Sequence, residues 1–453
     1  MAQTENNQSG EIFAALTDSN GFDRRLFDAD TRVNHAHCDA LFHAGILTRT
    51  ESERIKNGLQ AILKRAGYDK NYFSELRAPD IHSFAEARLA QLVGDTARKL
   101  AVGRSRSDHA ATVFRLWLRE ETEKITQFAR RLQTTLIDAA ERQRAAVLPA
   151  CALLGTVQPI LWAHWCLASF ERLARDRERL DEVWRRVNIM PLGSGVSAGT
   201  NFEIDREETA KNLGFEGVSS NSLDAVSDDD FVVEFVSACA LLMTHLARLA
   251  DDLILFASDE FQFIEFSAAN NGDFSPVKSG ALEFVRSKAG SIFGHQTALA
   301  AMPKNSPTAF GANLGETEKA VFDTVDCVKT CLNMTAKMLE NLRVREEGTR
   351  NTPLKNSAVA AEIADYLLLK NVPYQAACEA VEKIVGFAAL NRKRLDEISL
   401  TEMQKFSAQI ERDVFEVLSL KQMLAGKSQI GGTAPERVFE ALEAARAALG
   451  MEE

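Results

Sequence analysis

The sequence predicts an all-α protein built from long helices, and two features carry that prediction. Apolar residues recur three and four positions apart over most of the chain, which is the spacing of one face of an α-helix. Only 25 glycines and 10 prolines interrupt 453 residues, too few for a protein of many short strands. With 45% apolar residues, the chain is long enough for two or three domains.

Amphipathic periodicity predicts the helices in chain order, at residues 31–65, 84–99, 111–140, 161–187, 230–263, from 281 onward, and 316–344. Pro149 and Pro159 bracket a non-helical stretch, and residues 302–315 are irregular. Segments rich in glycine and serine are typical of loops, at 190–200, 219–227 and 270–280. Capped helix starts are predicted at 205–211 and 401–405, and Pro353 begins a C-terminal helical unit. We predict no strand pairing and no internal repeat.

The segment 230–263 has almost no helix breaker and is apolar on more than one face. A helix of that length spans about 45 Å. Such a helix needs neighbours all round, so we expect a multi-helix bundle shared between subunits.

The formal net charge of −11 argues against non-specific binding to nucleic acid or to an anionic membrane surface. We find no apolar run of the roughly 18 residues that a membrane span requires, and the polar start MAQTENNQSGE is not a secretory signal. Seven dispersed cysteines without a CxxC motif are typical of reduced thiols in the cytoplasm. Cys327 and Cys331, four residues apart with no histidine nearby, fit core packing better than zinc binding.

Four loops rich in polar and small residues are the expected place for a site: 103–109, the stretch around 150, 219–230 and 270–280. In GRSRSDH (103–109), two arginines precede a predicted helix start near Asp108, an arrangement that binds carboxylates. The alternative is a helix cap in which Asp108 pairs with an arginine. In SSNSLDAVSDDD (219–230), Ser227 or Asp228 is expected to cap the next helix. Lys278 can neutralise a carboxylate or simply be solvated, and His82 can orient a ligand or be structural.

Together these segments resemble the argininosuccinate lyases of the fumarase/aspartase superfamily. The matching stretches, from about residue 22 to the C-terminus, are DIHSFAEARL (80–89), GRSRSDHAATVFRLWLR (103–119), PLGSGVSAGTNFEIDREETAKNLGF (191–215), NSLDAVSDDDFVVEF (221–235), LEFVRSKAGSIFG (282–294) and GGTAPERV (431–438).

The resemblance implies three helical domains, which we place at 1–107, 108–352 and 353–453. It implies a central long-helix bundle, a homotetramer, and active sites assembled from three subunits. The reaction would be β-elimination of fumarate from argininosuccinate, a small dicarboxylate substrate, with neither cofactor nor metal. The positions it assigns to substrate binding are Asn34, His82, Arg106, Ser107, Gln158, Asn221, Ser222 and Lys278.

Several positions depart from the family pattern. The family's serine base lies in a loop written GSS-x-MPxKxNP, which here reads NNGDFSPVKSG (270–280). Its two serine positions fall near Gly272 and Asp273, so Ser275 and Asp273 are the candidate bases. The histidine of GYTHLQxAQPI becomes Leu153, and flanking positions become Ala152 and Gly155.

Further departures occur in the substrate-binding segments. The asparagine of GRSRND becomes Ser107, and the serine of D-x-x-x-S-x-A-H-A becomes Asn34. In the YNKDLQED region the chain carries Phe310, Ala312 and Gly315. A β-elimination requires a positioned base and donors for the developing carboxylate charge. Three interpretations follow: an argininosuccinate lyase, a lyase for a different succinyl-type substrate, or a non-catalytic scaffold or binding protein.

Overall fold

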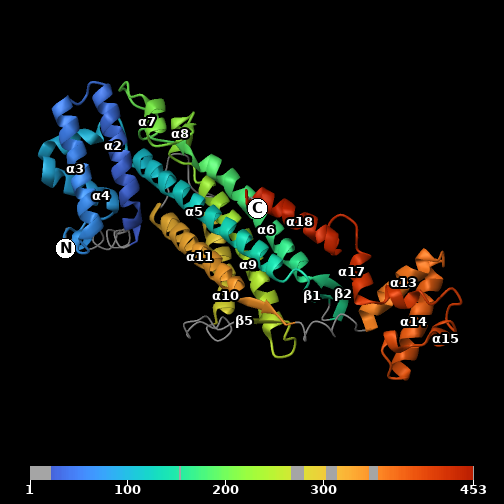
Figure 1. Ribbon diagram of the computed structural model, residues 1–453. Coiled ribbons are helices and arrows are strands. Elements are labelled where there is room, and N and C mark those ends of the chain that lie inside the picture. Colours follow the sequence, from blue (N-terminus) through green and yellow to red (C-terminus); the bar gives the residue numbers. More distant parts are fainter. Residues whose placement is uncertain (1–21, 153–154, 267–279, 303–313, 346–355, 452–453) are drawn as a thin grey trace, which may run out of the picture. The chain divides into compact units, whose positions relative to one another are not determined.

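The computed structural model describes residues 22–152, 155–266, 280–302, 314–345 and 356–451. Helices dominate the described chain, and the all-α prediction is confirmed (Figure 1). The N-terminal elements are η1 (Asp23–Leu26), α2 (Phe27–His43), α3 (Arg49–Tyr68), η2 (Tyr72–Ser74), α4 (Ile81–Val93) and η3 (Gly94–Ala101).

The middle of the chain carries the long helices. Its elements are α5 (Arg106–Arg142), β1 (Val147–Ala152), β2 (Gly155–Leu161), α6 (Trp162–Val187), β3 (Ile189–Met190), α7 (Arg206–Asn212), β4 (Gly217–Val218), α8 (Ser222–Ala225), α9 (Asp230–Ala257), β5 (Ile264–Phe266), α10 (Ala281–Ala301), α11 (Leu314–Glu340) and β6 (Leu342–Val344). The C-terminal elements are α13 (Asn356–Leu369), α14 (Tyr374–Leu390), η5 (Leu395–Glu397), α15 (Leu400–Met403), α16 (Val414–Val417), α17 (Leu420–Ala425) and α18 (Pro435–Ala448).

The expectation of no strand pairing is wrong in detail. β1 pairs with β2 and β5 with β6 in antiparallel ribbons, and β3 pairs with β4 in parallel. Strands β3 to β6 have only two or three residues, which is too short for a two-residue alternation to be visible in the sequence. The longer strands β1 and β2 each contain a proline, Pro149 or Pro159, and proline argues against a strand. Two of the three pairs also join segments far apart in the chain. The short strands lie in the connections between helices, so the fold class stays all-α.

Helix boundaries shift where glycine and turn chemistry intervene. The predicted 31–65 helix is two helices, because Gly45 adopts a left-handed φ of 71° after α2. The long apolar helix predicted at 230–263 ends at Ala257, so α9 has 28 residues. The predicted cap at Asp205 is confirmed, since its side chain accepts a hydrogen bond from the Glu208 amide. The predicted start at 401–405 is α15, capped by Ser399.

The described chain divides into two compact units, each assembled from three segments. Unit 1 contains residues 1–127, 176–243 and 288–330, and unit 2 contains 128–175, 244–287 and 331–453. Because this division follows contacts rather than chain order, the three domains expected from the sequence stay a prediction.

Within unit 1, aromatic side chains pack the long helices against one another. Phe114 on α5 meets Phe231 on α9 at 6.1 Å and Phe322 on α11 at 6.3 Å between ring centroids. Within unit 2, the indole nitrogen of the buried Trp162 on α6 donates to the Ala139 carbonyl of α5. These contacts pack α5 against α9 and α11 within unit 1 and against α6 within unit 2.

Helix α9 is long enough and apolar enough to cross a bilayer on length and composition alone. In its most apolar window, 56% of the residues are buried inside the molecule, and the core helix of a soluble protein passes the same test. The expectation that no apolar run reaches this length is therefore corrected for α9.

Candidate active site

The site begins at the first turn of α5, which is fixed by a reciprocal cap. The Ser105 amide donates to Oδ1 of Asp108 at 2.7 Å, and the Asp108 amide donates to Oγ of Ser105 at 3.2 Å. This is the capping box that starts a helix with two of its free amides satisfied. Of the two interpretations of Asp108, the structure supports the cap, but no arginine pairs with Asp108 among the described contacts.

The second carboxylate oxygen of Asp108 holds the glycine-rich loop 191–200. It accepts hydrogen bonds from the amides of Gly193 (3.0 Å) and Gly195 (2.8 Å), and Oγ of Ser105 donates to the Gly195 carbonyl at 2.6 Å. Gly195 has a φ of 61°, and a Cβ there would lie 2.4 Å from the Gly199 carbonyl oxygen. Glycine is therefore required at this position.

Asp30 is the centre of a buried cluster behind the α5 terminus. It is fully buried, and its Oδ1 lies 2.6 Å from Nδ1 of His82 and 2.7 Å from Nε2 of His109. Its Oδ2 accepts from the amide nitrogen of Asn34 at 2.8 Å. Burial opposes ionisation of Asp30, but the two imidazoles hold its pKa well below the ordinary value.

The contacts of His109 define its protonation state. An ionised Asp30 only accepts, so Nε2 of His109 carries the hydrogen. Arg104 only donates, and its Nη1 lies 3.0 Å from Nδ1 of His109, so Nδ1 is the acceptor. His109 is consequently a neutral imidazole with one fixed tautomer. Burial and the charge of Arg104 lower the pKa of His109 to about 3, which agrees with that assignment.

The same three groups have the composition of a metal site. The ligand atoms of Asp30, His82 and His109 all lie within 4.8 Å of one another. A cation there would have to displace the two N–H protons that face Asp30. It would also lie beside the nearly buried guanidinium of Arg104. These neighbours favour the hydrogen-bonded form.

Arg106, the first residue of α5, faces a second group of carboxyls. It forms an ion pair with Asp80, the N-cap of α4, and its side chain is 41% exposed. Glu318 on α11 is 5% exposed. Burial raises the pKa of Glu318 to about 7, with Asp23 and Asp80 adding to the rise and His82 and Arg106 opposing it.

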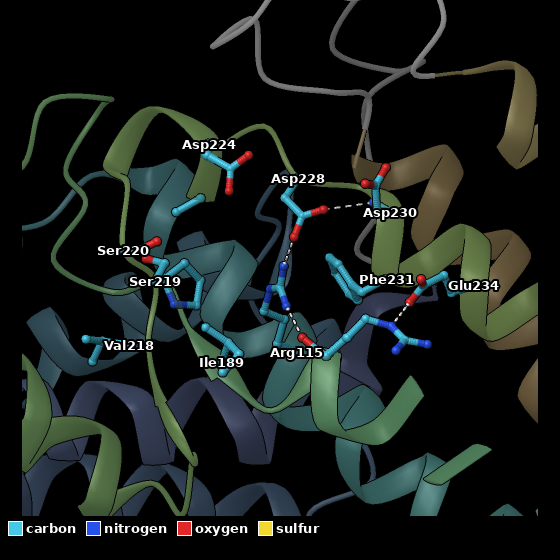
Figure 2. A pocket seen from close by; sticks show the side chains of 13 residues that line it. Arg115, Ile189, Val218, Ser219, Ser220, Asp224, Asp228, Asp230, Phe231 and Glu234 are labelled. Carbon is cyan, nitrogen blue, oxygen red and sulfur yellow. Dashed lines mark hydrogen bonds and ion pairs between the residues drawn. The ribbon is translucent and has the colours of Figure 1, made fainter. Parts of the chain in front are cut away.

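A pocket of about 480 Å³ lies further along the same helix (Figure 2). Arg115 crosses its floor, donating to Oδ2 of Asp228 at 2.5 Å and to the Arg186 carbonyl at 2.9 Å. Its guanidinium also lies 3.9 Å from the centroid of the Phe231 ring. Nine residues separate Arg106 from Arg115, or roughly 13 Å along a helix, so the pocket is distinct from the cluster around Asp30.

The predicted residues of the 219–230 loop lie beside this pocket. Asn221 caps α8, because its side chain accepts from the amides of Leu223 and Asp224, and Ser222 is half-buried on the first turn. Of the two predicted caps for α9, Asp228 is the one that accepts from the Asp230 amide, at 2.9 Å. Of the two predicted ligand residues of this loop, Asn221 therefore has a structural role as a helix cap.

Other predicted site residues are placed as follows. Asn34 lies on α2, donating to Asp30 and accepting from Arg104 at 2.8 Å, and Ser107 is half-buried in the first turn of α5. Gln158 lies half-buried on β2, in unit 2, whereas the clusters above belong to unit 1. The predicted positions outside the described residues are Ser275, Asp273, Lys278, Leu153, Phe310 and Ala312, and the side chain of Ala152 is also not described.

Sequence reasoning missed four polar residues that the structure brings to these two places: Asp30, His109, Arg115 and Glu318. Asp30 and Asn34 are four apart on a helix and share a face, and His109 ends the quoted GRSRSDH segment, so both had a signal. Glu318 has none, because nothing in a helical sequence marks which carboxyl is buried.

In sequence, the chain is similar to known lyases. Residues 5–278 match the family described as lyase, and residues 357–425 match the argininosuccinate lyase C-terminal family. The argininosuccinate lyase of Thioalkalivibrio sulfidiphilus is 41% identical over 96% of this chain and 94% of its own length. That of Ruthia magnifica is 39% identical over 94% of this chain and 90% of its own length.

Solved structures show the same fold. An EDDS lyase in complex with formate superposes with a TM-score of 0.82 at 25% identity, over 94% of this chain and 87% of that one. The 3-carboxy-cis,cis-muconate lactonizing enzyme of Pseudomonas putida has a TM-score of 0.75 at 18% identity, over 94% and 95% of the two chains. With near-complete coverage at about 40% identity and a glycine loop and capped α5 that preserve its motifs, this chain belongs to the argininosuccinate lyase family.

Proposed function

We propose that this chain cleaves argininosuccinate to arginine and fumarate by β-elimination, without a cofactor. The observation that carries the proposal is the identity of about 40% to argininosuccinate lyases over nearly the whole chain. A match of that extent covers the framework and the polar segments together. The start of α5 supports it, because Arg106 there is a partly exposed guanidinium, the group that pairs with carboxylates.

Arg106 is the proposed ligand of a substrate carboxylate. Its side chain is partly exposed at a helix N-terminus, where the free amides and the helix dipole also favour an anion. It pairs with Asp80, so a substrate carboxylate would compete with that ion pair. His82 is held in one orientation by Asp30, which suits a group that positions a substrate. Ser107, Asn221 and Ser222 are proposed as further contacts.

Proton abstraction is assigned to the loop that follows β5. Ser275 or Asp273 would take the proton from the carbon beside the carboxylate, and Lys278 would stabilise the resulting negative charge. Their assignment rests on the family resemblance of this loop. Gln158 is proposed as a contact supplied by another subunit.

The proposed assembly is a homotetramer with shared sites and three domains per chain, located in the cytoplasm. Exposed apolar side chains on α9 and α10 support an association of long helices: Leu241, Leu255, Phe284 and Phe293.

A second candidate function is a lyase for another succinyl-type substrate, or a homologue that binds without catalysis. Asn34 motivates it. Both ends of its amide are already engaged, by Asp30 and by Arg104, so Asn34 has little left to offer a substrate. The family's serine at this position has a smaller side chain than Asn34, and the Asn34 amide is already hydrogen-bonded at both ends. This exchange would alter which substrate fits.

The test is fumarate formation from argininosuccinate by the purified full chain, followed by ultraviolet absorbance. Turnover that falls by several powers of ten in Ser275→Ala or in Asp273→Asn would identify the base. Turnover unaffected by both variants would refute the assignment of the base to this loop. Binding of fumarate or succinate without turnover favours the second candidate, and absence of both leaves a scaffold.

A further inference from the structure

A second cavity of unit 1, about 370 Å³ in volume, lies beside α4 and η3 and is separate from the pocket around Arg115. That volume is within the range of small-molecule sites, about 300–1,000 Å³. Most of its wall consists of alanine and leucine side chains, and its polar groups are Ser83, Glu86, Arg98 and Arg104. The proposed lyase function gives this cavity no role.

Arg104 is the buried cation of this cavity, with a side chain that is only 4% exposed. A guanidinium carries five N–H donors and no acceptor. Nη1 of Arg104 donates to Oδ1 of Asn34 at 2.8 Å and lies 3.0 Å from Nδ1 of His109. Its Nη2 lies 3.7 Å from Oε1 of Glu86, an ion pair that is too long for a hydrogen bond. Within the described residues, the N–H groups on Nε and Nη2 therefore have no acceptor.

The unused donors of Arg104 reach the open space of the cavity. Neither Nε nor Nη2 is among the polar atoms that the described protein encloses without a partner, as it does Nδ1 of His37. Since the protein neither bonds nor encloses these two nitrogens, they face open space, and the cavity is the open space that Arg104 lines. Donors of a charged group in such a place are costly unless an acceptor meets them. We propose that this cavity binds a short-chain carboxylate, whose oxygens accept hydrogen bonds from Arg104.

The charges and the wall of the cavity select this class of ligand. Two arginines, Arg98 and Arg104, against one glutamate, Glu86, leave one positive charge in excess, which favours an anion. The planar fork of a guanidinium matches the two oxygens of a carboxylate. The apolar part of the wall suits a short aliphatic stem better than a fully hydrated phosphate. Its residues are Ala87, Ala90, Ala97, Leu100 and Ala101.

The cavity adjoins the proposed substrate-binding arginine and does not contain it. Ser83 lines the cavity, and Nη2 of Arg106 lies 3.5 Å from Oγ of Ser83. Arg106 itself pairs with Asp80 and is not a lining residue. The carboxylate site is therefore independent of the argininosuccinate reaction, and it can be tested whether or not the chain is a lyase.

Propionate is the probe, and its dissociation constant for the full chain is measured by ligand-observed nuclear magnetic resonance. Ala90 is an exposed lining residue of α4, so Ala90→Phe places a ring in the cavity without opening the core and should weaken binding at least about tenfold. Leu92→Phe, at a position 53% exposed on the same helix and outside the cavity, is the matched control and should bind as wild type. Glu86→Gln removes the ion-pair partner of Nη2 and should tighten binding about two- to fivefold, the effect of an exposed ion pair.

The location and the class of ligand are tested separately. Arg106→Gln should keep propionate binding, whereas loss of binding there, with binding kept in Ala90→Phe, would place the carboxylate at the proposed substrate site and overturn the inference. No saturable binding by the wild type, or weaker binding by Glu86→Gln, would overturn it as well. Inorganic phosphate that binds as tightly as propionate would refute the role of the aliphatic stem. Propionate binding that Ala90→Phe abolishes, in a chain that does not cleave argininosuccinate, would refute only the proposed function.

Discussion

Substitution of His109 is the sharpest test of the buried cluster, because we expect leucine at this position to lower stability strongly and glutamine to preserve it. The neutral imidazole donates to Asp30 at 2.7 Å and accepts from Arg104 at 3.0 Å. Glutamine carries one donor and one acceptor at similar positions and can make both contacts. Leucine fills the space and makes neither.

The magnitude follows from those two hydrogen bonds. Each joins His109 to a charged and buried partner, and such bonds contribute about 1.5–3 kcal/mol apiece. His109→Leu should therefore destabilise the surrounding helices by about 3–6 kcal/mol, a large share of a typical total stability of about 5–15 kcal/mol. His109→Gln should cost less than about 1 kcal/mol, since neither charged partner is left without a contact.

Hydrogen exchange read by mass spectrometry is the suitable assay, because it measures local stability separately in each part of a chain with two compact units. Amides of α2, α4 and the first turns of α5 should exchange about 100-fold faster or more in His109→Leu, given one tenfold change per 1.4 kcal/mol. His35→Leu, at an exposed position of α2, is the matched control. Unchanged protection in His109→Leu, or equal losses in both variants, would refute the assigned tautomer.

Three further outcomes are expected. Unfolded His109 binds a proton below its ordinary pKa of 6.5, whereas the folded residue stays neutral down to about 3. The unfolded state therefore holds more protons in this window, and the free energy of unfolding should fall by up to about 1.4 kcal/mol per pH unit below 6.5. Urea titrations of wild type and His109→Gln at several pH values measure this slope, which should be smaller in the variant. Gly195→Ala should cost at least about 1–2 kcal/mol for its left-handed backbone, plus the clash with Gly199, and should lower the midpoint of thermal unfolding. Arg115→Met should lower that midpoint by more than Arg115→Lys, because methionine leaves Asp228 without its buried cation at a cost of about 3–5 kcal/mol.

Much of the fold was predictable because long helices leave a clear periodic pattern in the sequence. The periodicity of the segments that became α5, α6 and α9 repeats over many turns, so single exceptions do not obscure it. The short strand pairs were not predictable, since β3 has two residues and its partner β4 lies 27 positions later. Long-range pairing of two residues carries no local signal.

Some residues of the site were predictable from the sequence and others were not. Arg106 and His82 were predicted from motifs and do lie near one another, since Arg106 contacts Asp80 and Ser83 at the start of α4, on either side of His82. Asn221 was predicted as a ligand, but its side chain caps α8, which shows that a motif preserves structure and chemistry with the same residue types. The burial of Glu318 depends on how distant parts of the chain pack together, which a linear sequence does not show.

The 37 residues of α5 impose a rule on how this protein can diverge. One continuous helix carries Arg106 and His109 on its first turn and Arg115 on its third turn. Gain or loss of a single residue within it would rotate everything beyond that point by about 100° and shift it by about 1.5 Å. Mutations that alter the length of α5 should therefore be purged, while new substrate preferences must arise by exchanging side chains along it or by resizing the loops that its neighbours carry.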